Sequence, residues 1–387
     1  MNLLQSASLS PLLPSIGEEF STSDAATGQL ATLGSLVGFG FSLAAAPWMD
    51  RWSRRTWFRV EGSLIIAGLL IAVLAPSLLL LAVGRVLTAS GASLIMANCM
   101  TGARELYPDP VQRNRAIGLI VSATTLVFIL GLPIVTQLEA QLGWRPAMAA
   151  IAVPAGLLLL GTFVLPDARA VSSARYQVRP TSAFRVILGN RRVAAFLVVL
   201  GLTSALYSGW FVYFGAYTTG VFAVSASLLS LLFLLAGATQ LLANNIAPVL
   251  VRRFDPLQVL YATMVAAATA LLLTGIVVTA VPTALMAGAI VLNGCGIAYI
   301  ATNVLLLDSD LPHPGAVMSM AAALGALGAA LGPFLTGLAL ANLGSFEAAY
   351  RTLGILAPLA ILTVWLGTRT APARMAERAP RPNSVER

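Results

Sequence analysis

The sequence predicts an all-α membrane protein whose helices cross the bilayer twelve times. The chain of 387 residues is 58% hydrophobic and only 10% charged, with a mean hydropathy of +0.86, whereas soluble domains carry about 25% charged residues. Twelve apolar runs follow one another along the chain. The basic residues are all arginine, and nearly all of them fall between the runs, on one predicted side of the membrane.

The runs are separated by short polar connections. In order, they cover residues 3–16, 28–49, 60–75, 78–102, 116–136, 146–165, 193–217, 226–251, 257–280, 283–307, 315–341 and 348–367. The first run is shorter than the ~20 residues that a spanning helix needs, so either this helix begins at the membrane surface or residues are missing before it. We predict a six-helix half over 1–166, a linker over 167–192, a second half over 193–368 and a tail over 369–387.

The arginine residues predict the orientation of the chain. If the connection around Asp50 is cytoplasmic, twenty arginines fall inside and only Arg145 and Arg351 fall outside. Because cytoplasmic loops are enriched in basic residues, both termini are predicted to be cytoplasmic. The net charge of +8 is then explained by loops beside an anionic lipid leaflet, and nucleic acid is not expected as a partner.

Several function classes lack the residues that their chemistry needs. Without lysine there is no phosphate-binding loop of the Walker type. His313 is the only histidine, and Cys99 and Cys295 both lie inside apolar runs, so no metal site, cofactor or catalytic constellation is expected. The chain is therefore not expected to be an enzyme. A non-transporting membrane sensor is a further alternative, but no signalling domain is recognisable.

The two halves of the sequence repeat several features. Pro133 in the fifth run recurs as Pro333 in the eleventh, and both are expected to bend their helices. Trp144-Arg145 just before the sixth run recurs as Tyr350-Arg351 at the start of the twelfth. These repeats predict two pseudo-symmetric six-helix halves.

The charged connection between the second and third runs resembles a known family signature. Residues 46–55 read Ala-Pro-Trp-Met-Asp-Arg-Trp-Ser-Arg-Arg and resemble the Gly-x-x-x-Asp-Arg-x-Gly-Arg-Arg loop of the major facilitator superfamily, matched by Asp50, Arg51, Arg54 and Arg55. The resemblance implies that these four residues form a conformational latch between the halves. The simpler alternative is that they only anchor the loop at the cytoplasmic face.

Arg85 is the clearest charge inside an apolar run, and a charge in hydrocarbon is a functional candidate by default. The segment 84–91 resembles the helix-four Arg-x-x-x-Gly pattern of the superfamily, which implies a role in proton coupling. The structural alternative is that Arg85 joins helix four to helix one. No carboxylate is expected deep in a helix, because Glu61 is placed near the cytoplasmic end of the third helix.

The resemblance implies that helices one, four, seven and ten line the substrate cavity. The polar and aromatic candidates in these helices are Gln5, Asn98, Tyr207, Trp210, Asn293, Tyr299 and Asn303. The aromatic residues of helix seven fall on one face and could equally serve helix packing. A cavity with few fixed charges predicts amphipathic or neutral substrates.

Together these expectations describe a monomeric secondary active transporter of the bacterial inner membrane, similar to multidrug and metabolite efflux permeases of the drug:proton antiporter kind. It would export small organic compounds by alternating access, with protons as the coupling ion. Uptake or uniport of a small metabolite is the alternative, and the missing intramembrane carboxylate favours it.

Overall fold

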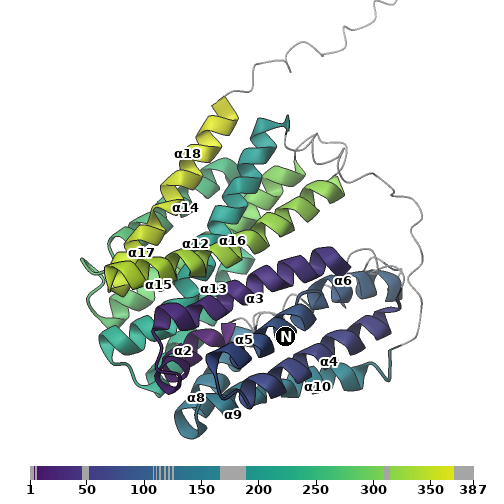
Figure 1. Ribbon diagram of the computed structural model, residues 1–387. Helices are drawn as coiled ribbons and strands as arrows, with labels where there is room; N and C mark the ends of the chain where they lie inside the picture. The colour runs from purple at the N-terminus through teal and green to yellow at the C-terminus, as the bar shows by residue number, and fades with distance from the viewer. Residues whose placement is uncertain are drawn as a thin grey trace, which may run out of the picture.

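The computed structural model describes residues 4, 7–45, 52–107, 126–165, 189–308 and 314–369, together with a few positions between 109 and 123. Within these residues the regular structure is helical, apart from an isolated bridge between Thr274 and Val278. Figure 1 shows two groups of helices, the first half in purple to blue and the second in teal to yellow. The helices α3 and α16 run side by side along their boundary.

The first half is built from helices that are partly interrupted. They are α2 (Leu9–Glu19), α3 (Asp24–Ala45), α4 (Arg54–Val73), α5 (Leu78–Ala92), α6 (Ile95–Leu106), the π-helix η2 (Val127–Gly131), α8 (Leu132–Leu142), α9 (Trp144–Ala150) and α10 (Ala152–Gly161). The predicted fourth helix is thus two segments, α5 and α6, and the sixth is divided into α9 and α10.

The second half has longer uninterrupted helices. They are α12 (Arg191–Phe222), α13 (Ala226–Arg253), α14 (Pro256–Leu272), α15 (Val281–Leu307), α16 (Pro314–Leu343), α17 (Phe346–Gly354) and α18 (Leu356–Arg369). The start of α12 falls two positions inside the predicted linker. Most of that linker, and all of the predicted tail beyond Arg369, lie outside the described residues.

The twelve-helix all-α membrane fold predicted from the sequence is confirmed. In the described part of the chain, nine helices are long and apolar enough to cross a membrane, and two shorter apolar helices cover Val127–Leu142 and Pro256–Leu272. With α2 they account for each of the twelve predicted runs in order.

Two predicted boundaries were wrong for identifiable reasons. The third helix begins at Arg54, six residues before the predicted start, because the Ser53 hydroxyl caps it by accepting a hydrogen bond from the Thr56 amide at 3.2 Å. The ninth helix ends at Leu272 rather than at 280. There the chain turns at Gly275, whose φ of +78° is a backbone conformation that favours glycine.

Glycine residues allow helices to approach closely within each half. In the second half, α16 crosses α12 so tightly that a side chain on Gly328 would collide with the backbone of Gly201. In the first half, a Cβ on Gly68 of α4 would lie 2.6 Å from the carbonyl oxygen of Gly84 in α5. Small residues at such crossings are typical of membrane helix pairs, whose association depends on close packing.

The two prolines expected to bend helices lie in different surroundings. Pro133 is near the start of α8 and directly follows the π-helical turn η2, so the fifth helix is irregular at this point. Pro333 lies inside the uninterrupted helix α16. Their role as kinks remains a prediction for both residues.

Candidate functional site

A cavity of about 590 Å³ lies between the two halves. Its walls come mainly from four helices, α3 and α5 of the first half and α12 and α16 of the second. This is the location predicted for the substrate site, between the halves. The helices differ from the expected set, because α3 and α16, which are helices two and eleven, provide much of the lining.

The lining is chemically simple. Small apolar residues dominate it, and polarity comes from the hydroxyl groups of Ser35, Ser42, Ser93, Tyr207 and Ser208. Arg85 is the one charged residue among the described residues that line the cavity. A ligand therefore meets hydroxyl groups, apolar surface and one guanidinium group.

Arg85 lies where helix four faces helix two. Its side chain is almost completely buried, with 5% exposure. Its Nη2 atom would lie 3.1 Å from a Cβ placed on Gly34 of α3, so the glycine leaves room for the guanidinium group. Ala89 and Ser93 follow Arg85 at successive helical turns and also line the cavity, so one face of helix four forms this wall.

One end of the cavity is closed by hydrogen bonds between the halves. The Tyr213 hydroxyl group lies 3.3 Å from the carbonyl oxygen of Ala25 in α3 and 3.3 Å from that of Pro333 in α16. Side chains on Gly28 or Gly337 would collide with this hydroxyl group. The absence of these side chains lets α12, α3 and α16 converge on the tyrosine.

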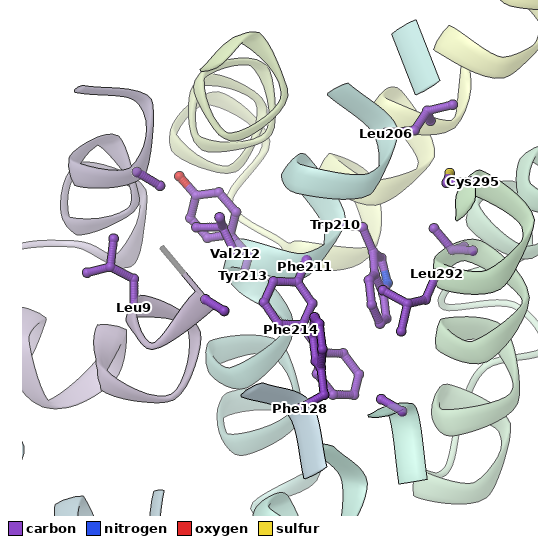
Figure 2. Close-up of a cluster of buried hydrophobic side chains, with 14 of the residues drawn as sticks. Leu9, Phe128, Leu206, Trp210, Phe211, Val212, Tyr213, Phe214, Leu292 and Cys295 are labelled. Atoms are coloured by element: carbon purple, nitrogen blue, oxygen red, sulfur yellow. The ribbon is translucent and has the colours of Figure 1, made fainter. Parts of the chain in front are cut away.

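A second contact fastens helix one to helix seven beside the tyrosine. The Ser10 hydroxyl group donates to the carbonyl oxygen of Phe211 at 2.8 Å and accepts from the Gly215 amide at 3.1 Å. Aromatic rings of α12 continue this closure, and Figure 2 shows Phe211 and Phe214 gathered with Phe128 of the first half. The halves are thus joined at the level of residues 10–28 of the first half.

The opposite end of the cavity lies toward the end of α3. Leu43, a lining residue two positions from that end, has 58% of its side chain exposed. The hydrogen bonds that Ser10 and Tyr213 make between the halves lie on the closed side, and those of Ser230 lie between α8 and α13. The described contacts thus close the cavity toward Glu19.

The predicted cavity residues of helix seven separate into two roles. Tyr207 lines the cavity, and its ring stacks on that of Phe211 at 5.9 Å between centroids. Trp210 lies outside the lining, because its ring packs on Phe214 at 4.7 Å and fills the space beside Gly288 of α15. Figure 2 shows it directed toward Leu292.

The predicted cavity residues of helix ten also lie outside the lining. Tyr299 has 42% of its side chain exposed, and the Asn303 amide donates to its carbonyl oxygen at 2.8 Å within the same helix. Asn293 has a buried Oδ1 atom without a hydrogen-bond partner in the described part of the chain. Helix ten packs with α12, α13 and α14 instead, which turns these residues away from the cavity.

The remaining candidates lie elsewhere or outside the described residues. Gln5, Asp50 and Arg51 belong to the positions that the structure does not describe. Arg55 is partly buried, and its Nε atom has no hydrogen-bond partner among described residues. Asn98, expected in the cavity, is instead completely buried in a polar cluster between α4 and α6.

This polar cluster is the feature that sequence reasoning missed. Arg54 forms an ion pair with Glu105 at 3.1 Å and donates to Asn98 Oδ1 at 3.2 Å, while the Asn98 amide donates to Glu61. Glu61 has no exposed surface, although it lies in the third turn of α4, near the end of the third helix where the sequence placed it. The spacing offered a signal, because Arg54 with Glu61 and Asn98 with Glu105 are each seven residues apart, on one face of a helix.

Comparison with known proteins identifies the family. The model of the Major Facilitator Superfamily matches residues 1–316. The chain belongs to this superfamily. Members among its relatives are transporters, so the protein is a multi-pass membrane transporter and not an enzyme.

Curated relatives within the Major Facilitator Superfamily are distant. The uncharacterized transporter YbcL of Bacillus subtilis is 26% identical over 243 residues, covering 61% of this chain and 60% of YbcL. The chloramphenicol efflux pump Rv0191 of Mycobacterium tuberculosis is 28% identical over 156 residues, covering 40% and 38%. An H(+)/hexose cotransporter of Parachlorella kessleri is 30% identical over 123 residues, covering 32% and 23%. The chain thus matches less than two thirds of the length of these relatives.

Solved structures of the Major Facilitator Superfamily share the fold over nearly the whole chain. The nucleoside transporter NupG has a TM-score of 0.76 at 15% identity, covering 95% of this chain and 97% of NupG. A D-xylose-proton symporter has a TM-score of 0.75 at 16% identity, covering 94% of both chains. At this level of identity the likeness concerns the fold alone.

Proposed function

We propose that this transporter exports small amphipathic or neutral organic compounds across the bacterial inner membrane by proton-coupled alternating access. It would act as a monomer with both termini in the cytoplasm. The observation that supports this proposal is the cavity between the halves. It is closed at one end, and its described lining consists of apolar residues, hydroxyl groups and one charged residue.

The lining supports this substrate class through its charge. Arg85 is accompanied by no carboxylate among the described lining residues, so a cationic compound would meet a like charge in a low-dielectric site. Multiply charged anions would require several cations. A neutral or amphipathic compound places its apolar part against Ala323 and Ala326 and its hydrogen-bonding groups on Tyr207 or Ser208.

Alternating access requires that the closure at Tyr213 opens while the other end closes. The latch residues would act in that second step. Asp50 and Arg51, which lie outside the described residues, would approach the start of α16 at Pro314 with Arg55 beside them, and Arg54 would hold the end of their loop through its ion pair with Glu105. A helix start attracts a carboxylate because its amide groups are unpaired and its dipole end is positive.

Uptake or uniport of a small metabolite is the second candidate. Hydroxyl groups in the lining can exchange hydrogen bonds with the hydroxyl groups of a sugar or nucleoside. The similarity to an H(+)/hexose cotransporter over 123 residues favours this alternative. Uniport predicts exchange of a sugar or nucleoside without a proton gradient, whereas cotransport of the kind that this relative's name gives predicts uptake driven by one.

The test is transport by the purified chain in proteoliposomes. Chloramphenicol, other neutral amphipathic compounds, sugars and nucleosides are offered with and without an imposed proton gradient. We expect gradient-driven flux of an amphipathic compound, reduced at least about tenfold in Arg85→Ala. Arg85→Lys keeps the charge but loses the planar fork of donors. We therefore expect this variant to fold normally and to transport more slowly than the parent.

The exposed Arg252 of the second half provides the matched control, and Arg252→Ala should transport like the parent. Gradient-independent exchange of a sugar or nucleoside would contradict proton-coupled efflux and support the second candidate, uptake or uniport of a small metabolite. Full flux in Arg85→Ala would leave Arg85 with a structural role and contradict its part in the proposal.

A further inference from the structure

A buried carboxyl group lies inside the first half, apart from the cavity. Glu61 is in the third turn of α4, about 10 Å along the helix axis from Arg54. None of its surface is exposed. An ionised carboxylate in such a place loses its hydration, which is expensive unless cations and hydrogen-bond donors replace the water.

The donors around Glu61 replace only part of that hydration. The Asn98 amide donates to Oε1, and Asn98 is itself completely buried. The Oε2 atom is buried and has no hydrogen-bond partner among the described residues. An ionised carboxylate can accept up to about four hydrogen bonds. Among the described residues, one oxygen atom of Glu61 has a donor and the other has none.

The charges around Glu61 are unbalanced. Arg54 is the neighbouring cation, and it pairs with Glu105 at 3.1 Å while contacting Asn98 at 3.2 Å. Two carboxylates, Glu61 and Glu105, therefore share one guanidinium group. With both ionised, the three groups carry a net charge of −1 inside the helix bundle.

The described cations of the helices packed against α4 are directed away from Glu61. Arg85 of α5, the helix that packs most extensively on α4, has its guanidinium group beside Gly34 of α3. Cys99 is the other titratable group on α6 that interacts with Glu61. Arg59 of α4 is directed to α10, where it contacts Thr162 and the Phe163 ring. Arg145 of α9 contacts the far end of α4 at the Val73 carbonyl oxygen.

Helix four connects Glu61 with the cavity. The glycine at position 91 brings this helix against α4, where a Cβ on Gly91 would lie 2.5 Å from the carbonyl oxygen of Glu61. Two residues further on, Ser93 lines the cavity on another face of the same helix. The division between α5 and α6 falls at this point, so a change at Glu61 and Asn98 acts on the segment that adjoins the cavity wall.

We propose that Glu61 is a proton-binding site that couples proton binding to the arrangement of helix four, an inference that rests on the proposed proton-coupled function. One proton converts the carboxylate to a neutral carboxylic acid. Arg54 then remains paired with Glu105, and the three groups together carry zero net charge. The hydrogen bond from the Asn98 amide to Glu61 weakens, because its acceptor is no longer charged. Proton release restores the ionised carboxylate and, with it, the stronger hydrogen bond that joins α4 to helix four.

Infrared difference spectroscopy tests proton binding without any substrate. The full chain in lipid nanodiscs is compared between about pH 6 and about pH 9, a range in which exposed carboxyl groups stay ionised. We expect a carbonyl band of a protonated carboxylic acid at the lower pH, and its loss in Glu61→Gln. The band should persist in His313→Gln, which removes the only histidine, and should weaken in Glu105→Gln, because Arg54 can then stabilise the ionised form of Glu61.

A second carboxylate variant covers the case in which Glu61→Gln does not fold. Glu61→Asp keeps a carboxyl group in a slightly different position, so the band should persist at a shifted frequency. An unshifted band in Glu61→Asp, a band that survives in Glu61→Gln, or no band in the parent would each overturn the assignment.

Transport measurements separate this inference from the proposed function. In proteoliposomes, Glu61→Gln should lose at least about tenfold of the gradient-driven flux while it retains substrate exchange. Unchanged gradient-driven flux in Glu61→Gln would overturn coupling through Glu61 but leave proton-coupled efflux intact. Absence of gradient-driven flux in the parent, with the infrared band present, would instead reject the proposed coupling and keep the proton site.

Discussion

The two halves hold their helix ends together in the same way on the closed side of the molecule. Trp144 at the start of the sixth helix donates to Glu19 of the first helix, and Tyr350 near the start of the twelfth donates to the Trp210 carbonyl oxygen of the seventh. The arginine after each aromatic residue, Arg145 or Arg351, donates to carbonyl oxygens at the end of the third helix of its own half.

The halves differ in where they carry charge. The buried charged residues in the described part of the chain, Arg54, Glu61 and Arg85, all belong to the first half. The buried polar residues of the second half are neutral, as Gln240 and Thr302 illustrate. The shared feature is therefore structural, whereas the groups able to bind protons or ions are concentrated in one half. The pseudo-symmetry of the helices therefore does not extend to the distribution of buried charge.

The largest expected effect comes from removing the cation of the polar cluster. Arg54→Ala leaves Glu105 and Glu61 without their guanidinium partner, and breaking a buried pair in this way lowers the free energy of unfolding by about 3–5 kcal/mol. Arg252→Ala, at an exposed position of the second half, should change it by less than about 0.5 kcal/mol. Chemical unfolding in detergent measures both, and equal losses would contradict the asymmetry between the halves.

The repeated arginine contacts should differ in strength. Arg145 donates to the Val73 and Ala75 carbonyl oxygens at 2.9 and 2.8 Å and pairs with Glu19, whereas Arg351 donates to the Thr274 carbonyl oxygen at 2.7 Å. The exposed pair with Glu19 adds little. At about 1.5 kcal/mol for each charged hydrogen bond to a carbonyl oxygen, Arg145→Ala should lower the free energy of unfolding by about 3 kcal/mol and Arg351→Ala by about 1.5 kcal/mol.

Melting temperatures of the two arginine variants in the same detergent provide the measurement. Lysine at either position serves as the control, because it keeps the charge and can make one of the bonds. A larger loss for Arg351→Ala than for Arg145→Ala would reverse the order expected from the contacts.

The smallest expected effect concerns two tyrosine hydroxyl groups. The Tyr213 hydroxyl joins the halves, whereas that of Tyr350 bonds within the second half. Each Tyr→Phe change should cost about 1 kcal/mol. Only Tyr213→Phe should alter the ratio of the two access states, by about fivefold toward opening of the closed end. Distance distributions between spin labels on α2 and α17 report this ratio, and an equal change in Tyr350→Phe would remove the special role of Tyr213.

Several aspects of the fold could be predicted because they depend on short stretches of sequence. Hydropathy over about 20 residues identifies a spanning helix wherever it packs. Arg85 could be recognised inside an apolar run without knowing its neighbours. The repeated Trp144-Arg145 and Tyr350-Arg351 pairs predicted similar contacts in the two halves. The carbonyl oxygens that the arginines bind could not be predicted. The start of α4 was missed because charged residues at a helix end interrupt an apolar run but continue the helix.

The site depended on which face of each helix meets which partner. The sequence by itself determined the twelve apolar helices, the order of the halves and the presence of one arginine at membrane depth. Only the tertiary structure decided that Tyr207 faces the cavity while Tyr299 faces outward, and that Glu61 and Asn98 meet in a buried cluster. The physical reason is that hydropathy is a local property, whereas the rotation of a helix about its axis is set by close packing against helices that are distant in sequence.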